Sequence, residues 1–152
     1  MRALISILLL LFGGVACTKA HQEASAPSRL YFAVEVHRNG EVIAQPRLLG
    51  EEGVTLRAER RPVGASASDY VLRLRPVRNG GVYEIDVDLA LPGANAHREL
   101  SLLHGEVRRL ELGSVPGELS LQLLLMEVDS PEFRALMQLG NEGPAVGGAG
   151  AI

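Results

Sequence analysis

Two Asn-Gly pairs, each between segments of alternating apolar and polar residues, constrain the fold of this chain most strongly. The first pair, Asn39-Gly40, follows a segment from Leu30 to Val36 in which every second residue is large and apolar. Asn-Gly accepts the positive φ angles of a type I′ turn, which joins two antiparallel strands. With a two-residue loop, Val36 faces Ile43 across the hairpin, and Pro46 ends the returning strand or places it at a sheet edge.

The second pair lies within Asn79-Gly80-Gly81, and it leaves two registers open. If Asn79-Gly80 is the loop, Leu74 pairs with Ile85, whereas a Gly80-Gly81 loop pairs Leu74 with Val87. Either register places leucines opposite valine or isoleucine on one face and arginines opposite carboxylates on the other. The expected charge ladder consists of Arg73 and Arg75 on one strand and Glu84, Asp86 and Asp88 on the next.

Further short alternating segments, at 54–58, 100–102, 110–112 and 119–125, are separated by turn residues. This spacing predicts an all-β fold, an antiparallel β-sandwich or a small barrel. The dense leucines between Leu119 and Val128 suit a buried helix as well as a strand, and the preceding Val115-Pro116-Gly117 favours the strand. Tyr70 and Tyr83 share the parity of the apolar residues around them, so we expect both in the core.

One short C-terminal helix completes the predicted fold. Ser130 can cap it, Pro131 suits its first turn, and Gly140 suits the αL position that ends it. The helix has one apolar face, formed by Phe133, Leu136 and Met137.

The start of the chain has the three parts of an export signal. Arg2 is basic, an apolar stretch runs from Ala3 to Phe12, and small residues precede Cys17, the only cysteine. About ten apolar residues are too few to cross a bilayer, which needs roughly 20. The sequence Gly14-Val15-Ala16-Cys17 resembles the lipobox of bacterial lipoproteins, with Gly14 in the place where leucine is usual.

This resemblance implies that a diacylglyceryl group is attached to the Cys17 sulfur, that cleavage precedes Cys17, and that the new amine is acylated, for example with palmitate. Because Thr18 rather than aspartate follows the cysteine, the resemblance favours the outer membrane, facing the periplasm. Two other interpretations stay open: cleavage after Ala20 by the ordinary signal peptidase, or an incidental cysteine in an uncleaved helix. An unpaired thiol is a liability in an oxidising compartment, which favours acylation.

The chain therefore divides into four predicted parts: a signal peptide at 1–16, a lipid-anchored tether at 17–28, a single β-rich domain at 29–140 and a Gly/Ala-rich tail at 141–152. The tether lacks large apolar residues and reaches roughly 20 Å as a flexible coil. We expect the tail to be disordered unless a partner orders it.

Charge and motifs exclude several classes of function. The net charge is −3 and basic clusters are missing from the sequence, so we expect no nucleic-acid partner. No Gly-x-Ser-x-Gly elbow, phosphate-cradling loop or His-Glu-x-x-His motif occurs in the sequence. We therefore predict no enzymatic activity, no catalytic residue and no cofactor.

His97 and His104, with Glu99 and Glu106 near them, are the candidate metal ligands, because two imidazoles and a carboxylate can hold a divalent ion. Their seven-residue spacing matches no zinc motif, so we expect no metal site. An acidic row also offers oxygen ligands for calcium: Glu84, Asp86 and Asp88. Alternate residues on one strand span about 13 Å and cannot surround one ion.

The leading functional hypothesis is a non-enzymatic envelope lipoprotein whose β-domain binds or supports a protein partner at the cell envelope. Strand edges near Pro46, or at Leu119 to Val128, would take the partner by β-augmentation. One alternative is a periplasmic metal- or small-ligand-binding protein, possessing hydrolytic activity through His97 and His104. A third hypothesis is an apolar-ligand carrier, since leucine-rich β-domains can enclose a cavity.

The segment Gln45-Pro46-Arg47-Leu48-Leu49, with the Gly-Glu turn after it, resembles a proline-led strand and turn in the β-domain of bacterial secretins. The likeness covers about a dozen residues, and the chain lacks the pore-forming hairpins of that family. It implies an envelope β-module.

Overall fold

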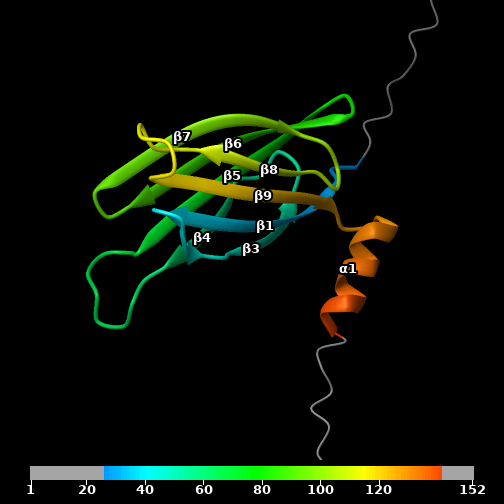
Figure 1. Cartoon of the computed structure of the whole chain (residues 1–152). Coiled ribbons are helices and arrows are strands. Elements are labelled where there is room, and N and C mark those ends of the chain that lie inside the picture. The colour runs from blue at the N-terminus through cyan, green and yellow to red at the C-terminus, as the bar shows by residue number, and fades with distance from the viewer. Residues whose placement is uncertain (1–25, 142–152) are drawn as a thin grey trace, which may run out of the picture.

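The computed structural model describes residues 26–141 of the chain (Figure 1). The predicted signal peptide, Cys17, most of the tether and residues 142–152 of the tail lie outside the described residues. Nine strands form two antiparallel sheets, which confirms the all-β prediction, and one helix follows them. The strands are β1 (Arg29–Arg38), β2 (Glu41–Ala44), β3 (Arg47–Glu51), β4 (Leu56–Arg60), β5 (Tyr70–Asn79), β6 (Val82–Leu91), β7 (Ala94–Leu102), β8 (Val107–Glu111) and β9 (Leu119–Glu127), and the helix is α1 (Pro131–Asn141).

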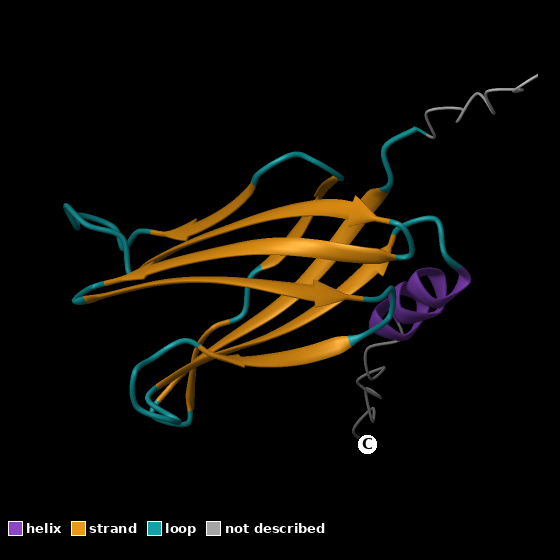
Figure 2. Ribbon diagram, turned by 90° about the horizontal axis from the view of Figure 1, so that it is seen from above, coloured by secondary structure: helices purple, strands orange, loops and turns teal. Residues whose placement is uncertain are grey.

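The two sheets pack face to face as a β-sandwich. In the first sheet the strand order is β2-β1-β9-β8, with β3 pairing with the first half of β1, and in the second it is β4-β5-β6-β7. The chain forms β1 to β3 in the first sheet, β4 to β7 in the second, and β8 and β9 in the first again. It therefore crosses between the sheets after β3 and again after β7 (Figures 1 and 2). The pairing of β1 with β9 brings the first and last strands together at the centre of the first sheet.

The leucine-rich segment is a strand, as expected, but it is not an edge. β9 pairs with β1 on one side and with β8 on the other. Leu121, Leu123 and Leu125 are fully buried because they point between the sheets. The prediction that this segment offers an edge for β-augmentation is wrong, since both of its edges are already hydrogen-bonded.

The second hairpin has Gly80-Gly81 as its loop, because Asn79 pairs with Val82. This settles the register: Leu74 pairs with Val87, Arg75 with Asp86 and Arg73 with Asp88. Gly80 has a φ of 64°, the left-handed conformation that glycine adopts without steric cost.

The first hairpin turns at Asn39-Gly40, with φ angles of 52° and 83°, but its register differs from the prediction. Arg38 pairs with Glu41, and an irregularity then shifts the ladder so that Val36 faces Ala44 rather than Ile43. The extra residue of such a bulge moves the pairing by one position. As a result the two small, buried side chains of Val36 and Ala44 lie opposite each other.

The helix begins as predicted and ends later than predicted. The Ser130 hydroxyl accepts a hydrogen bond from the Phe133 N–H at 3.1 Å, which caps the N-terminus of the helix. Gly140 lies within α1 and has no positive φ, so its predicted αL role is wrong. Glycine tolerates the helical conformation as well as αL, so its presence does not by itself end a helix.

The core fills the space between the two sheets with alternate side chains of their facing strands. Tyr83 and Phe32 are its largest fully buried members, and a further set of leucines, valines and one isoleucine surrounds them. At one margin of this core, Gly50 of β3 lies against Leu56 of β4. A Cβ atom at Gly50 would come within 2.0 Å of the Leu56 Cδ2 atom.

Two arginines bridge the open seams between the sheets. At one seam, Arg60 of β4 donates to the Ile43 carbonyl of β2 at 3.4 Å. At the other seam, Arg98 of β7 donates to the Leu112 carbonyl at 3.5 Å. Arg98 lies opposite Val87, an interior position, yet its side chain is exposed. Charged residues at such positions discourage edge-to-edge pairing with other chains.

Replacing Gly50 with alanine should lower the free energy of unfolding by about 1 to 3 kcal/mol, because the new methyl group displaces the buried Leu56 side chain. Urea denaturation measures the change. Gly81→Ala is the matched control, since its Cβ would meet nothing within 4 Å and its φ lies outside the left-handed region. In a Leu56→Ala background the cost of Gly50→Ala should nearly vanish. An undiminished cost there would contradict the proposed clash.

Candidate functional site

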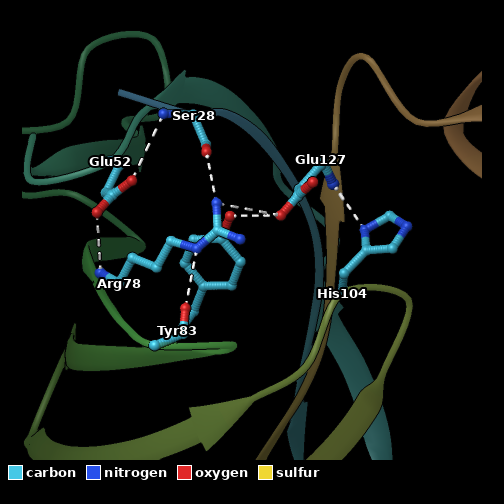
Figure 3. A network of polar contacts seen from close by, with 7 residues as sticks. Ser28, Glu52, Arg78, Tyr83, His104 and Glu127 are labelled. Carbon is cyan, nitrogen blue, oxygen red and sulfur yellow. Dashed lines mark hydrogen bonds and ion pairs between the residues drawn. The ribbon is translucent and has the colours of Figure 1, made fainter. Parts of the chain in front are cut away.

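A network of polar side chains lies at one end of the sandwich, where the chain enters β1 (Figure 3). We call this the entry end. It contains Ser28, the turns after β3, β5 and β7, and the start of α1. Backbone hydrogen bonds hold these segments together: Glu52 N–H to the Ser28 carbonyl at 3.0 Å, Gly53 N–H to the Pro76 carbonyl at 2.7 Å, and Val128 N–H to the Arg29 carbonyl at 2.9 Å.

Tyr83 and Glu127 link the two sheets at this end. The Tyr83 ring is buried at the end of an interior row, and its hydroxyl donates to Glu127 Oε1 at 2.6 Å. The Arg78 guanidinium lies 5.5 Å from the Tyr83 ring centroid, and its Nη1 atom is 3.9 Å from Glu127 Oε1. Burial, followed by the hydrogen bond to Glu127, raises the pKa of Tyr83. The phenol therefore stays protonated and donates to the carboxylate.

Arg78 also fixes the segment that precedes β1. Its Nη1 atom donates to the Ser28 hydroxyl at 3.2 Å, and its backbone N–H donates to Glu52 Oε1 at 3.2 Å. The other Glu52 oxygen accepts the Ser28 N–H at 3.5 Å. A strand of the second sheet and the turn after β3 thus hold Ser28 in place (Figure 3).

His104 lies in the turn after β7 and connects β9 to α1. Its Nδ1 atom accepts the Glu127 N–H at 2.9 Å, so the neutral imidazole carries its proton on Nε2. Nε2 is 3.4 Å from Glu132 Oε2 in the first turn of α1. A backbone N–H at the helix N-terminus, and then His104, lowers the pKa of Glu132. His104 is thus a structural link between a turn, a strand and a helix.

His97 lies in the middle of β7 and does not meet His104. Its Nδ1 atom is 2.8 Å from Asp88 Oδ1, and its Nε2 atom is 4.0 Å from Glu99 Oε1. The strand from His97 to Leu102 alone spans about 17 Å. Across residues 26–141, no three His, Cys, Asp or Glu side chains are grouped so that they could hold a metal ion. The two histidines that the sequence suggested as partners have separate neighbours.

Glu106 likewise has a local role rather than a ligand role. Its carboxylate accepts the Leu103 N–H at 2.9 Å and also bonds to Arg108. The Leu103 N–H, followed by Arg108, lowers the pKa of Glu106. The carboxylate therefore stabilises the turn that carries His104.

The outer face of the second sheet carries rows of basic and acidic side chains. Arg73 and Arg75 of β5 lie in register with Asp88 and Asp86 of β6, as one of the two predicted registers requires. Within residues 26–141, however, neither arginine forms an ion pair within 4.0 Å. We call this surface the charged face; it consists of Arg57, Glu59, Arg73, Arg75, Glu84, Asp86, Asp88, His97 and Glu99.

The interior that an apolar-ligand carrier would use is occupied by side chains. Leu72, Leu74 and Leu121 are among the core residues with no exposed surface. One hollow of about 570 Å³ lies at the surface between Tyr31, Arg47 and the last residues of α1. Tyr31 also contacts Phe133 of α1, with ring centroids 5.3 Å apart. This contact fastens the helix to the first sheet.

The search for relatives gives no assignment. No protein-family model matches the chain, and neither the curated proteins nor the solved structures contain a significant match. No helix within residues 26–141 is long and apolar enough to cross a membrane.

Sequence reasoning placed Tyr83 in the core but missed the network that its hydroxyl joins. A tyrosine at the end of an interior row and beside a turn needs a partner for its hydroxyl, and this was the available signal. The partner, Glu127, is 44 residues away, so only the folded chain identifies it.

Replacing Tyr83 with phenylalanine should lower the free energy of unfolding by about 0.5 to 1.5 kcal/mol, because it removes one hydrogen bond between the sheets and keeps the ring. Tyr70→Phe is the matched control, since the Tyr70 hydroxyl has no hydrogen-bond partner among the described residues. Urea denaturation of both variants tests this. Equal losses would show that the Tyr83–Glu127 bond does not matter for stability.

The raised pKa of Tyr83 also predicts a pH dependence. The folded state holds the phenol proton more tightly than the unfolded state, whose pKa is about 10. The protonated Tyr83 phenol therefore makes a contribution to the unfolding free energy that is fully present below about pH 10. This contribution is lost as the pH rises beyond that value. Between about pH 9 and 11, the wild type should lose more stability than Tyr83→Phe. Parallel curves of unfolding free energy against pH would contradict this prediction.

Proposed function

We propose that this protein is an exported envelope lipoprotein, attached through lipid at Cys17 to the outer membrane and facing the periplasm. Its β-sandwich serves as a non-enzymatic module that binds or supports a protein partner. Support for the anchor comes from the lipobox-like sequence before Cys17 and from the absence of any other cysteine.

The observation that carries the docking role is the charged face. Arg73 and Arg75 form a basic row on β5, and acidic side chains occupy the β6 and β7 side of this face. On β4, Arg57 and Glu59 pair with each other at 2.6 Å. Arg73 and Arg75 are exposed and their charges are not matched by an ion pair in the described part of the chain. A partner with the complementary pattern would gain specificity and speed of association from this arrangement.

A face suits the docking role better than a strand edge does. The Pro46 carbonyl, near one predicted edge, already accepts the Val34 N–H at 3.0 Å. Arg60 and Arg98 cover the seams beside β4 and β7. A partner strand added at either seam would meet a charged side chain, whereas the charged face is exposed to solvent.

Reversing the charge of the arginines tests this docking role. Arg73→Glu/Arg75→Glu should reduce recovery of a crosslinked envelope protein about tenfold or more, because like charges now oppose the partner. The matched control is Arg29→Glu/Arg38→Glu, which makes the same change in net charge on β1 of the other sheet and should leave recovery unchanged. Recovery that is equal for both double variants, or no specific partner for the wild type, would refute the docking role.

The anchor is tested separately by mass spectrometry of the mature N-terminus and by partition between membrane and soluble fractions. The expected result is an N-terminal Cys17 bearing diacylglyceryl and acyl groups, with Cys17→Ser released from the membrane. An unmodified N-terminus at another residue would refute the lipoprotein assignment.

A further inference from the structure

Exposed apolar side chains are unevenly distributed over the described residues. Ten large apolar side chains are exposed, and seven of them lie on segments at or next to the entry end. Their exposed fractions range from 41% to 70%. We call these seven the entry-end ring: Leu49, Val54, Val77, Leu103, Val107, Met137 and Leu139.

The members of the ring come from four separate stretches of the chain: 49–54, 77, 103–107 and 137–139. Val54 and Leu103 lie in the turns that follow β3 and β7, and Met137 and Leu139 lie on α1. The others lie near strand ends: Val77 directly precedes Arg78, which bonds to Ser28; Leu49 pairs with Tyr31 near the start of β1; and Val107 begins β8. Figure 2 shows α1 at the end where the chain enters the sandwich.

The length of chain before the domain limits what can cover this ring. Twelve residue steps separate Cys17 from Arg29, so the two lie at most about 40 Å apart when the chain is fully extended. As a flexible coil the same segment spans on the order of 20 Å. A lipid on Cys17, which is part of the proposed function and on which this inference rests, therefore keeps the entry end close to the bilayer.

The charges around the ring indicate which part of a bilayer it would contact. Acidic side chains outnumber basic ones here, so attraction to anionic headgroups does not drive the contact. The apolar side chains themselves are the binding element. The charged residues near the ring are Arg29, Arg47, Arg78, Arg108 and Arg134, against Glu51, Glu52, Glu84, Glu106, Glu127, Asp129 and Glu132.

We infer that the entry-end ring rests in the interfacial layer of the membrane that holds the lipid anchor, and that it orients the sandwich with its long axis away from the bilayer. Apolar side chains of interfacial segments penetrate about 5 to 10 Å into the boundary between headgroups and acyl chains. This orientation leaves the charged face on the side of the domain, accessible to a protein partner.

The chain itself provides a clean way to test this contact. Cys17 is the only cysteine, and acylation converts its sulfur to a thioether, so one introduced cysteine is the only thiol in the mature protein. Acylated full-length Leu103→Cys and Leu139→Cys, labelled with an environment-sensitive dye, are placed in phosphatidylcholine vesicles that contain a bilayer-depth quencher lipid. Val115→Cys is the matched control, because it is 59% exposed and lies in the turn before β9 at the opposite end.

We expect quenching at Leu103 and Leu139 about three times that at Val115, since only the ring enters the interfacial layer. Added phosphatidylglycerol should not increase the quenching. Val54→Ser in the Leu139→Cys protein should weaken it, whereas Val42→Ser at the other end should not.

The outcomes separate this inference from the proposed anchor. Mass spectrometry and vesicle flotation establish first whether the protein carries its lipid. A lipidated protein with equal quenching at all three positions overturns the inference and leaves the lipoprotein proposal intact. The inference is also overturned if the dye on the ring is shielded from water in native envelope membranes but not in pure lipid vesicles. That result would assign the ring to a protein contact. If the protein carries no lipid, both the lipoprotein proposal and the membrane contact of the ring are refuted.

Discussion

The pairing of β1 with β9 is the interaction on which the rest of the structure depends. It joins the first and last strands along nine residue pairs, from Leu30 opposite Glu127 to Arg38 opposite Leu119. Because the pair is antiparallel, the start of β1 lies beside the end of β9. The chain therefore enters the sandwich and leaves for α1 at the same end. Contacts so far apart in sequence carry a large entropic cost of loop closure, and the buried leucines of β9 offset it.

The polar network makes this shared end a defined structure. Tyr83 of the second sheet bonds to Glu127 of the first, and Arg78 holds Ser28 beside them. His104 then connects β9 to α1. These contacts position the exposed apolar residues of the entry end around the point where the chain enters, while the charged face remains on the side of the second sheet. The two proposed surfaces, one for membrane and one for protein, thus lie on different parts of the fold and meet where Val77 pairs with Glu84.

Sequence reasoning succeeded where neighbouring residues decide the structure. It located both hairpin turns, the helix cap at Ser130 and the β9 strand, because turn chemistry and alternation act over a few residues. It failed where the tertiary environment decides: the bulge that pairs Val36 with Ala44, the continuation of α1 past Gly140, and the pairing of β9 on both of its edges. Of the candidate site, it identified the rows of opposite charge and missed the Tyr83 network.

By itself, the sequence determined the antiparallel strands, their buried faces and the lipobox-like segment before Cys17, since each depends on the order of nearby residues. Only the tertiary structure decided that β9 is central rather than an edge, and that the entry end combines a polar network with exposed apolar side chains. The physical reason is that these features join residues up to 97 positions apart, as for Leu30 and Glu127. Their pairing follows from how two sheets bury one core, and no local pattern of residues encodes it.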